Sequence, residues 1–321
     1  MTRTVTTIIA VALAAFAGSA AAQNFPTRPI TLVVPFPPGG STDTTARIIA
    51  ERMRAPLGQT VVIENAGGAS GSIALARVAR ANPDGYTIDI GQWDTHVGNI
   101  IYPLTYDLQK DFEPIGLMTI NPQLMIARKD FPANDLKGLV AWMKANPGKA
   151  TLVEQTAAAK IAGIQMEQAT GTSLTFVPFR GAGPAMQAML GGQVDLMILQ
   201  AAAVMPQARA GAIKILANLS PKRSAVIPDV PTSDESGVKG LYAAGWFGLF
   251  GPKGMKKEVV AKINAAMMEA LADPAIKARF SDLGLDLAPR ELQTPEGLAA
   301  FHKAETDKWW PVIKAAGIKV E

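Results

Sequence analysis

The chain has 321 residues, a formal net charge of +4 and no cysteine, and 48% of its residues are hydrophobic. A charge this small, carried by scattered rather than clustered basic residues, argues against a nucleic-acid partner. With no cysteine and only two histidines, His96 and His302, the composition also disfavours a structural zinc site, and we expect neither a metal nor a cofactor.

The first 22 residues have the pattern of a secretory signal peptide. Arg3 precedes an apolar run from Ile8 to Phe16, and small residues, Ala20–Ala22, stand before Gln23. The run is too short for a transmembrane anchor. We therefore expect export to the periplasm, with cleavage after Ala22.

After this leader the chain alternates strand-like and helix-like patterns. Ile30–Val34 is a short apolar run typical of a buried strand, and Asp43–Arg54 carries apolar residues at helical spacing. A second strand at Thr60–Ile63, a helix around 73–79 and a third strand at Tyr86–Ile90 follow. Strand–helix repetition of this kind predicts a parallel sheet with right-handed crossovers.

Turn-forming residues dominate 103–122, and a second α/β series begins after them. Its predicted strands are Leu124–Ala127, Thr151–Val153, Leu174–Val177, Val194–Leu199 and Ile213–Leu216, with helices near Leu136–Ala145, Ile161–Ala169 and Pro184–Leu190 and a last one ending at Arg209.

Residues 220–240 are again rich in loop formers, a strand is expected at Trp246–Phe250, and the remaining chain is helical. If this helical tail packs on the first block, the chain crosses between the blocks twice, which makes a hinge. The expected fold is α/β, with two lobes that each hold a mainly parallel sheet flanked by helices and with a ligand cleft at the hinge. The first lobe is expected at 23–124 plus 247–321, and the second at 125–246.

A glycine-rich turn separates the first strand from its helix. Gly39 and Gly40 let a ligand approach the backbone, and Ser41, Thr42 or Asp43 can cap the helix. Free N–H groups at a helix start suit an anion, at roughly 0.3–1 kcal/mol for each helix end. Because a micromolar ligand needs about 8 kcal/mol, one turn cannot supply the whole binding energy.

A second such turn, Gly67–Gly71, follows the next strand, so that both turns are expected on one wall of the cleft. Ordinary tight turns between strand and helix remain the alternative for both. The nucleotide-binding patterns G-x-x-x-x-G-K-[ST] and G-x-G-x-x-G are absent. The stretch around Ser70 fails the G-x-S-x-G pattern of hydrolases at its last position, which favours binding over catalysis.

Many short motifs in this order resemble one family, the substrate receptors of tripartite tricarboxylate transporters, often called Bug receptors. The resemblance covers essentially the whole chain after the leader. The motifs are Phe25–Ile30, Pro38–Asp43, Ile63–Gly71, Pro83–Thr87, Asp111–Ile115, Phe176–Gly181, Gly191–Asp195, Pro228–Thr232 and Trp246–Leu249.

The resemblance implies a monomeric, type II-like periplasmic binding protein that closes over a small organic acid and presents it to membrane subunits of such a transporter. Main-chain N–H groups of the first turn would hold one carboxylate. Asp43 is expected to cap its helix more than to touch the ligand. The residues implied at the ligand are Phe36, Pro38, Gly39, Gly40, Ser41 and Asp43, with Gly68, Ala69 and Ser70 alongside and Thr95 and His96 from a Thr-x-His-like element.

The second lobe departs from the family pattern, because Val153–Lys160 replaces a Gly- and Ser-rich loop. Our hypothesis is that Glu154, with Gln155 and Thr156, faces the distal end of the ligand and disfavours a second carboxylate there. The alternative is that Glu154 points to solvent and pairs with Lys160.

A second departure is Trp93, which can stack on a flat ligand or pack beneath the loop. Trp93, Asp94 and Glu154 together suggest an aromatic monoacid. Phe179 and Arg180 follow a strand of the second lobe, where Arg180 can bind a carboxylate or stay solvated. Asp195 and Gln200 flank another strand, and Asp195 is expected to hold backbone rather than ligand.

The sequence therefore predicts a binding protein rather than an enzyme. Two alternatives remain open at this point: a receptor of the same fold that signals to a sensor kinase, and an exported enzyme. A catalyst would need a nucleophile with its base, or a set of metal ligands, and the sequence offers neither.

Overall fold

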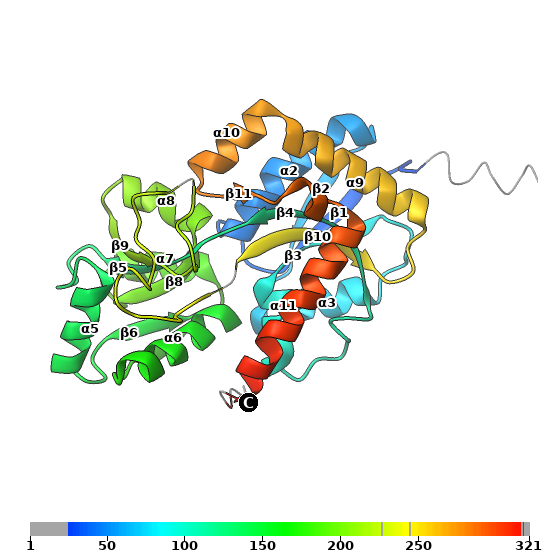
Figure 1. Cartoon of the computed structure of the whole chain (residues 1–321). Helices are drawn as coiled ribbons and strands as arrows, with labels where there is room; N and C mark the ends of the chain where they lie inside the picture. The colour runs from blue at the N-terminus through cyan, green and yellow to red at the C-terminus, as the bar shows by residue number, and fades with distance from the viewer. Residues whose placement is uncertain (1–24, 226, 244, 316, 318–321) are drawn as a thin grey trace, which may run out of the picture.

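The computed structural model describes residues 25–225, 227–243, 245–315 and 317. They form two α/β lobes, each a sheet flanked by helices (Figure 1). The predicted signal peptide lies outside the described residues. Within the described part, no helix is both long enough and apolar enough to cross a membrane.

The described part of the first lobe is built on a six-stranded sheet in the order β11-β4-β10-β3-β1-β2. The strands β1, β2 and β3 pair in parallel, and β10 inserts antiparallel between β3 and β4, so four of these six strands point the same way. The bounds are β1 (Ile30–Val34), β2 (Val61–Asn65), β3 (Thr87–Gln92), β4 (Phe112–Ile120), β10 (Trp246–Pro252) and β11 (Asp286–Leu287).

The described part of the second lobe holds a five-stranded sheet in the order β7-β6-β8-β5-β9. Here β5 is antiparallel to both of its neighbours, and the other four strands share one direction. Both sheets are therefore mainly parallel with a reversed strand inside. The bounds are β5 (Gln123–Arg128), β6 (Thr151–Glu154), β7 (Thr175–Pro178), β8 (Leu196–Gln200) and β9 (Ile213–Asn218).

Helices cover both sheets. In the first lobe, α2 packs against α9, and α11 lies on β4, so the C-terminal helices return to the first lobe (Figure 1). First-lobe helices are α2 (Ser41–Leu57), α3 (Ser72–Ala79), α4 (Trp93–His96), α9 (Lys257–Ala272), α10 (Pro274–Asp282) and α11 (Pro295–Ala315), with 3-10 turns η1 (Ala69–Gly71), η2 (Gly98–Ile101) and η3 (Arg290–Gln293). Second-lobe helices are α5 (Leu136–Ala145), α6 (Ala157–Thr170), α7 (Ala182–Leu190) and α8 (Ala201–Arg209).

The chain changes sheet between β4 and β5, at 121–122, and again between β9 and β10, at 219–245. Two passages of this kind fit the hinge expected from the sequence. We propose that the lobes divide at these passages. Gln123 and Leu124 then belong to the second lobe, because β5 carries them into the second sheet.

Two strands of the described part were not predicted. The two-residue β11 lies in the C-terminal segment that was expected to be helical, and the longer one is β4. The segment 103–122 reads as turn-rich, yet it contains β4, which runs for nine residues between β10 and β11. Pro114 lies inside this strand, beside an irregularity in the pairing between Leu249 and Phe250 of β10. A proline is tolerated at such a bulge. The turn-forming residues of 103–122 therefore predicted a loop where the chain forms a strand.

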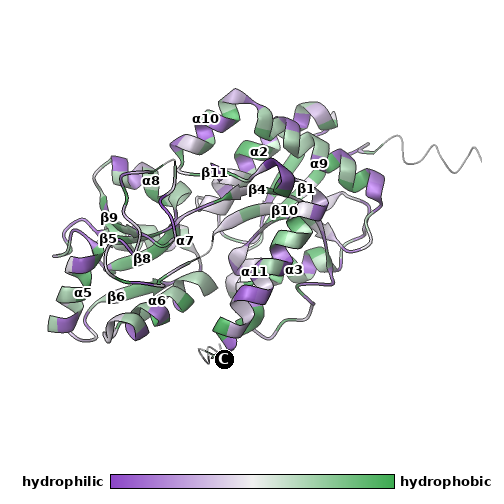
Figure 2. Cartoon of the chain, viewed as in Figure 1, coloured by the Kyte–Doolittle hydropathy of each residue, from purple (hydrophilic) through white to green (hydrophobic). Residues whose placement is uncertain are grey.

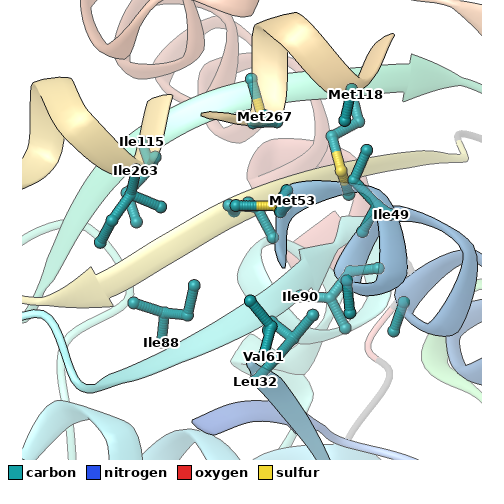
Figure 3. Close-up of a cluster of buried hydrophobic side chains, with 14 of the residues drawn as sticks. Leu32, Ile49, Met53, Val61, Ile88, Ile90, Ile115, Met118, Ile263 and Met267 are labelled. Carbon is teal, nitrogen blue, oxygen red and sulfur yellow. The ribbon is translucent and has the colours of Figure 1, made fainter. Parts of the chain in front are cut away.

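Successive side chains of a strand point to opposite faces of the sheet, and both faces are buried along β1 and β10. Leu32 of β1 contributes to a core cluster with Met53 of α2 and Met267 of α9, whereas Val33 faces the opposite side of the sheet. Figure 3 shows this first cluster, with aliphatic side chains from β1, β3, β4, α2 and α9 meeting between the layers. The hydropathy colouring shows the same separation, with apolar strands inside and polar helix faces outside (Figure 2).

We predict that Met53→Ala lowers the free energy of unfolding by about 2–5 kcal/mol, because Met53 is fully buried and its removal leaves a cavity. Glu51→Ala, an exposed position on the same helix, is the matched control and should change stability by no more than about 0.5 kcal/mol. Denaturant unfolding measures both variants. Equal effects for the two would contradict the packing described for α2.

Candidate functional site

A cavity of about 40 Å³ lies between the lobes, at the carboxyl ends of β1, β3, β6 and β8. Ligands of open α/β sheets bind at such strand ends. Of the described residues that line it, none is Lys or Arg. The first lobe contributes Phe36, Pro37, Gly40, Ser41, Thr42, Gln92 and Asp94, and the second contributes Gln123, Gln155, Thr156, Ala182, Ile198, Leu199 and Gln200.

The start of α2 forms one wall. Its N-cap residue is Gly40, which provides no side-chain cap, and Gly39 adopts a φ of +89° that favours glycine. The Asp43 carboxylate does not cap the amides of Ser41 and Thr42; it accepts hydrogen bonds from Gly39 N, at 3.0 Å, and from Arg47 and Asn65. Burial raises the pKa of Asp43, but these hydrogen bonds outweigh it and lower the pKa overall.

A second helix start faces the first from the other lobe. The N-cap of α7 is Gly181, which also provides no side-chain cap, and Ala182 lines the cavity. A Cβ atom added at Gly40 would lie 3.8 Å from the Cβ of Ala182, and one added at Gly181 would lie 2.9 Å from Pro37 Cδ. The two N-termini thus approach closely, and each carries the partial positive charge of a helix end.

Four glutamines surround this gap: Gln92, Gln123, Gln155 and Gln200. Gln92 Oε1 accepts from Thr42 Oγ1 at 3.0 Å and from Gln200 Nε2 at 3.3 Å, so the second contact joins the lobes. Gln155 Nε2 donates to Ile198 O at 2.7 Å. The Oε1 atoms of Gln155 and Gln200 are buried without a hydrogen-bond partner, and they are therefore free to accept from a ligand.

Asp94 is the acidic residue of the lining, and it is only 2% exposed. Its Oδ1 accepts from the backbone N of Ala158, in α6 of the opposite lobe, at 2.7 Å. Burial raises the pKa of Asp94 to about 6, against the lowering effect of hydrogen bonds from the Ala158 amide and the Thr156 side chain. An acceptor from the first lobe thus occupies a helix start of the second.

Six of the residues expected at the ligand line the cavity: Phe36, Gly40, Ser41, Gln155, Thr156 and Gln200. Sequence reasoning missed Gln92 and Gln123, and it weighed Asp94 only beside Trp93. A signal was present, because Gln92 and Gln200 each end a strand and Gln155 follows one directly.

Three expected residues near Asp94 lie in the core instead. Trp93 is 1% exposed and packs edge-on against Trp309, so it cannot stack on a ligand. Thr95 Oγ1 accepts from Gln92 N and donates to Gln92 O, so this hydroxyl is used at the start of the short α4. His96 is stacked on Phe250 with ring centroids 4.0 Å apart, and burial lowers its pKa well below the usual value.

Other expected residues lie outside the cavity lining. Glu154 forms an ion pair with Lys160 at 2.9 Å, Arg180 is exposed, and Phe179 packs against a core cluster of the second lobe. Asp195 accepts from Arg128 and from Thr151, and so holds second-lobe backbone as expected.

The two glycine-rich turns of the first lobe support the cavity wall at the start of α2, mostly without lining the cavity. Pro38, Gly39 and Asp43 shape the start of α2 without lining the cavity, and Gly68, Ala69 and Ser70 form a turn behind Pro37. A Cβ at the neighbouring Gly67 would lie 3.1 Å from Pro37 Cδ, and Asn99 Nδ2 donates to Ser70 O at 3.1 Å. This second turn supports the first.

Comparison with known proteins agrees with this architecture. The family model described as "Tripartite tricarboxylate transporter family receptor" matches residues 45–318. A protein of Agrobacterium vitis, encoded in the TAR-I ttuE-ttuC' intergenic region, is 36% identical over 92% of this chain and 87% of its own. The periplasmic binding protein BugD is 40% identical, with a TM-score of 0.87 over 92% of this chain and all of BugD.

The malate-bound structure of MatC from Rhodopseudomonas palustris is 38% identical, with a TM-score of 0.85 over 90% of this chain and all of MatC. These matches confirm the two-lobed fold and the resemblance found in the motifs. The chain belongs to the family of tripartite tricarboxylate transporter receptors and is a solute-binding receptor.

Proposed function

We propose that the protein captures a small organic acid in the cavity and holds one carboxylate between the starts of α2 and α7. The observation that carries this proposal is the approach of two helix N-termini that have no side-chain cap, in a buried gap. Two positive helix ends repel one another unless an anion lies between them. Peptide N–H groups at helix starts are suited to bind that anion.

The energetics agree with a site of this design. Partly buried helix ends contribute up to about 2 kcal/mol each, so two of them supply about half of the 8 kcal/mol that a micromolar affinity needs. Further hydrogen bonds, among them those that the unpartnered Oε1 atoms of Gln155 and Gln200 can accept from a ligand, would supply the remainder.

The bound malate of MatC supports a carboxylic acid as the ligand. The family supports a membrane transporter of the tripartite tricarboxylate type as the partner and the periplasm as the location. That the protein works as a monomer stays a prediction from the sequence. An aromatic acid loses its main support, since the Trp93 ring packs in the core.

Contacts within the cavity favour binding over catalysis. The Ser41 hydroxyl donates to the backbone oxygen of Gln200, and the Asp94 carboxylate accepts from Ala158, so these two groups are not paired for proton transfer. The groups that reach the cavity therefore suit gripping a solute without transforming it.

We predict that Ser41→Pro weakens binding of the carboxylic acid at least tenfold. Ser41 is the first residue of α2 and Gly40 before it is extended, so proline fits the backbone and removes one N–H group. A hydrogen bond to a charged group is worth about 1.5–3 kcal/mol. Calorimetric titration with the acid that gives the largest thermal shift in a panel measures the loss.

Ser41→Ala is the matched control, because it removes the hydroxyl and keeps the N–H; its affinity should stay within about threefold of the parent. If Ser41→Pro binds the acid as tightly as Ser41→Ala does, the amide of Ser41 holds no carboxylate and the proposed function fails.

The stability of the fold should depend on pH through Asp94, which is buried where the lobes meet and whose pKa is raised from 3.8 to about 6. A raised carboxyl pKa means that the folded state prefers the proton, so stability falls as pH rises from about 4 to above 6, by about 3 kcal/mol. Asp94→Asn cannot ionise, and its gain in Tm over the parent should be larger at pH 7.5 than at pH 4.5.

Thermal unfolding at the two pH values measures this difference. The exposed carboxylate of Glu51, replaced in Glu51→Gln, controls for the loss of one negative charge. A gain for Asp94→Asn that is the same at both pH values would show that Asp94 does not titrate in this range.

A further inference from the structure

A carboxylate of the protein itself occupies the start of α6. Asp94 extends from α4 of the first lobe, and its Oδ1 accepts from Ala158 N in the second lobe at 2.7 Å. The next amide, Ala159 N, donates to the capping hydroxyl of Thr156 at 3.2 Å, and Lys160 N donates to Thr156 O. The donors at this helix start are thus largely used by protein acceptors.

The helix starts around the cavity are therefore unequal. Those of α2 and α7 have no side-chain cap, whereas α6 is capped by Thr156 and also binds Asp94. The starts of α2 and α7 can receive an anionic group of a ligand directly. The start of α8 also lacks a side-chain cap, but its first amide, Ala201 N, donates to Pro122 O. An anion at α6 would have to displace the Asp94 carboxylate.

The rest of the lining around Asp94 offers acceptors. Gln155 and Gln200 are 4% and 5% exposed, and the Oε1 atom of each lacks a partner, because their Nε2 atoms donate to Ile198 O and Gln92 Oε1. The lining thus includes two amide oxygens without partners and a carboxylate, and these groups would surround the part of the ligand that is not held by α2 and α7. Such a set is complementary to an N–H or O–H donor and repels a second carboxylate.

We propose that Asp94 is a specificity-determining residue that makes this receptor selective for acids with one carboxylate and a hydrogen-bond donor at the other end, such as a hydroxyl or an amide. The inference rests on the proposed function, since it assumes that a carboxylate is held at α2 and α7. At pH 7.5 the Asp94 side chain carries its negative charge, because its pKa is only raised to about 6.

Pairs of ligands that differ in one group test the selectivity. Malonate, succinate and glutarate are each compared with their mono-amides by calorimetric titration at pH 7.5. For the chain length that binds most tightly, the parent should bind the mono-amide at least tenfold more tightly than the diacid. A parent that binds the diacid equally well or better overturns the inference.

Variants then assign the selectivity to Asp94. Asp94→Ser frees the Ala158 amide and removes the charge, so the ratio of the two affinities should shift at least tenfold toward the diacid. Asp94→Asn keeps the shape and an acceptor for Ala158, and should shift the ratio in the same direction by a smaller factor. Circular dichroism establishes that each variant is folded.

Glu154→Gln is the matched control, because it removes a nearby carboxylate that pairs with Lys160 and does not line the cavity; the ratio should stay as in the parent. If the parent binds the acids but neither Asp94 variant changes the ratio, this inference fails and the proposed function stands. If the parent binds none of the six compounds but binds another acid of the thermal-shift panel, the inference fails and the proposed function stands; if it binds no acid of the panel, the proposed function fails as well.

Discussion

Two helix starts without side-chain caps, those of α2 and α7, meet at the centre of this molecule, one from each lobe. Each presents unpaired N–H groups and a partial positive charge, so their approach costs free energy unless an anion lies between them. This electrostatic constraint explains why the residues at the junction are Gly40 and Gly181. A Cβ at Gly181 would lie 2.9 Å from Pro37 Cδ at a φ of +128° that favours glycine, whereas a Cβ at Gly40 would make an ordinary contact, 3.8 Å from Ala182. A capping side chain at either position would satisfy the amides that glycine leaves free.

The surroundings keep those amides available. Asp43 lies within the first turn of α2 and could have capped it, but its carboxylate is held by Gly39, Arg47 and Asn65. The hydrogen bonds that lower its pKa also keep it ionised and fixed beside the helix. Asp43 thus fixes the turn without occupying the free N–H groups of Ser41 and Thr42.

Much of the fold could be predicted from sequence, because local pattern decides it. The run Ile30–Val34, its glycine-rich turn and the amphipathic helix after it are visible as residues, and the two turn-rich passages marked where the chain changes sheet. The strand β4 could not be predicted, because Pro114 reads as a breaker and only the irregular pairing with β10 accommodates it.

Only one wall of the site, the start of α2, could be predicted, because a single continuous segment forms it. Backbone groups at Gly40 and Ser41 follow from the turn itself. The sequence did not indicate which side chain of the short α4 would point into the cavity. Trp93 packs against Trp309 in the core, and its neighbour Asp94 accepts a hydrogen bond from Ala158, 64 residues away in the chain. A charge that disfavours a second carboxylate was expected from Glu154, which the structure pairs with Lys160.

Contacts between the lobes also bear on how a ligand is retained. Asp94 with Ala158, Gln200 Nε2 with Gln92 and Ser41 Oγ with the Gln200 oxygen join the lobes directly, and the last two are long, at 3.3 and 3.4 Å. A ligand shifts the balance between open and closed forms only by its difference in affinity for the two. Burial of the Asp94 carboxylate costs free energy, and its hydrogen bond from Ala158 offsets part of that cost, so this contact adds little to closure when Asp94 is ionised. In the function that we propose, an anion between α2 and α7 would remove the repulsion of the helix ends and so favour the closed form.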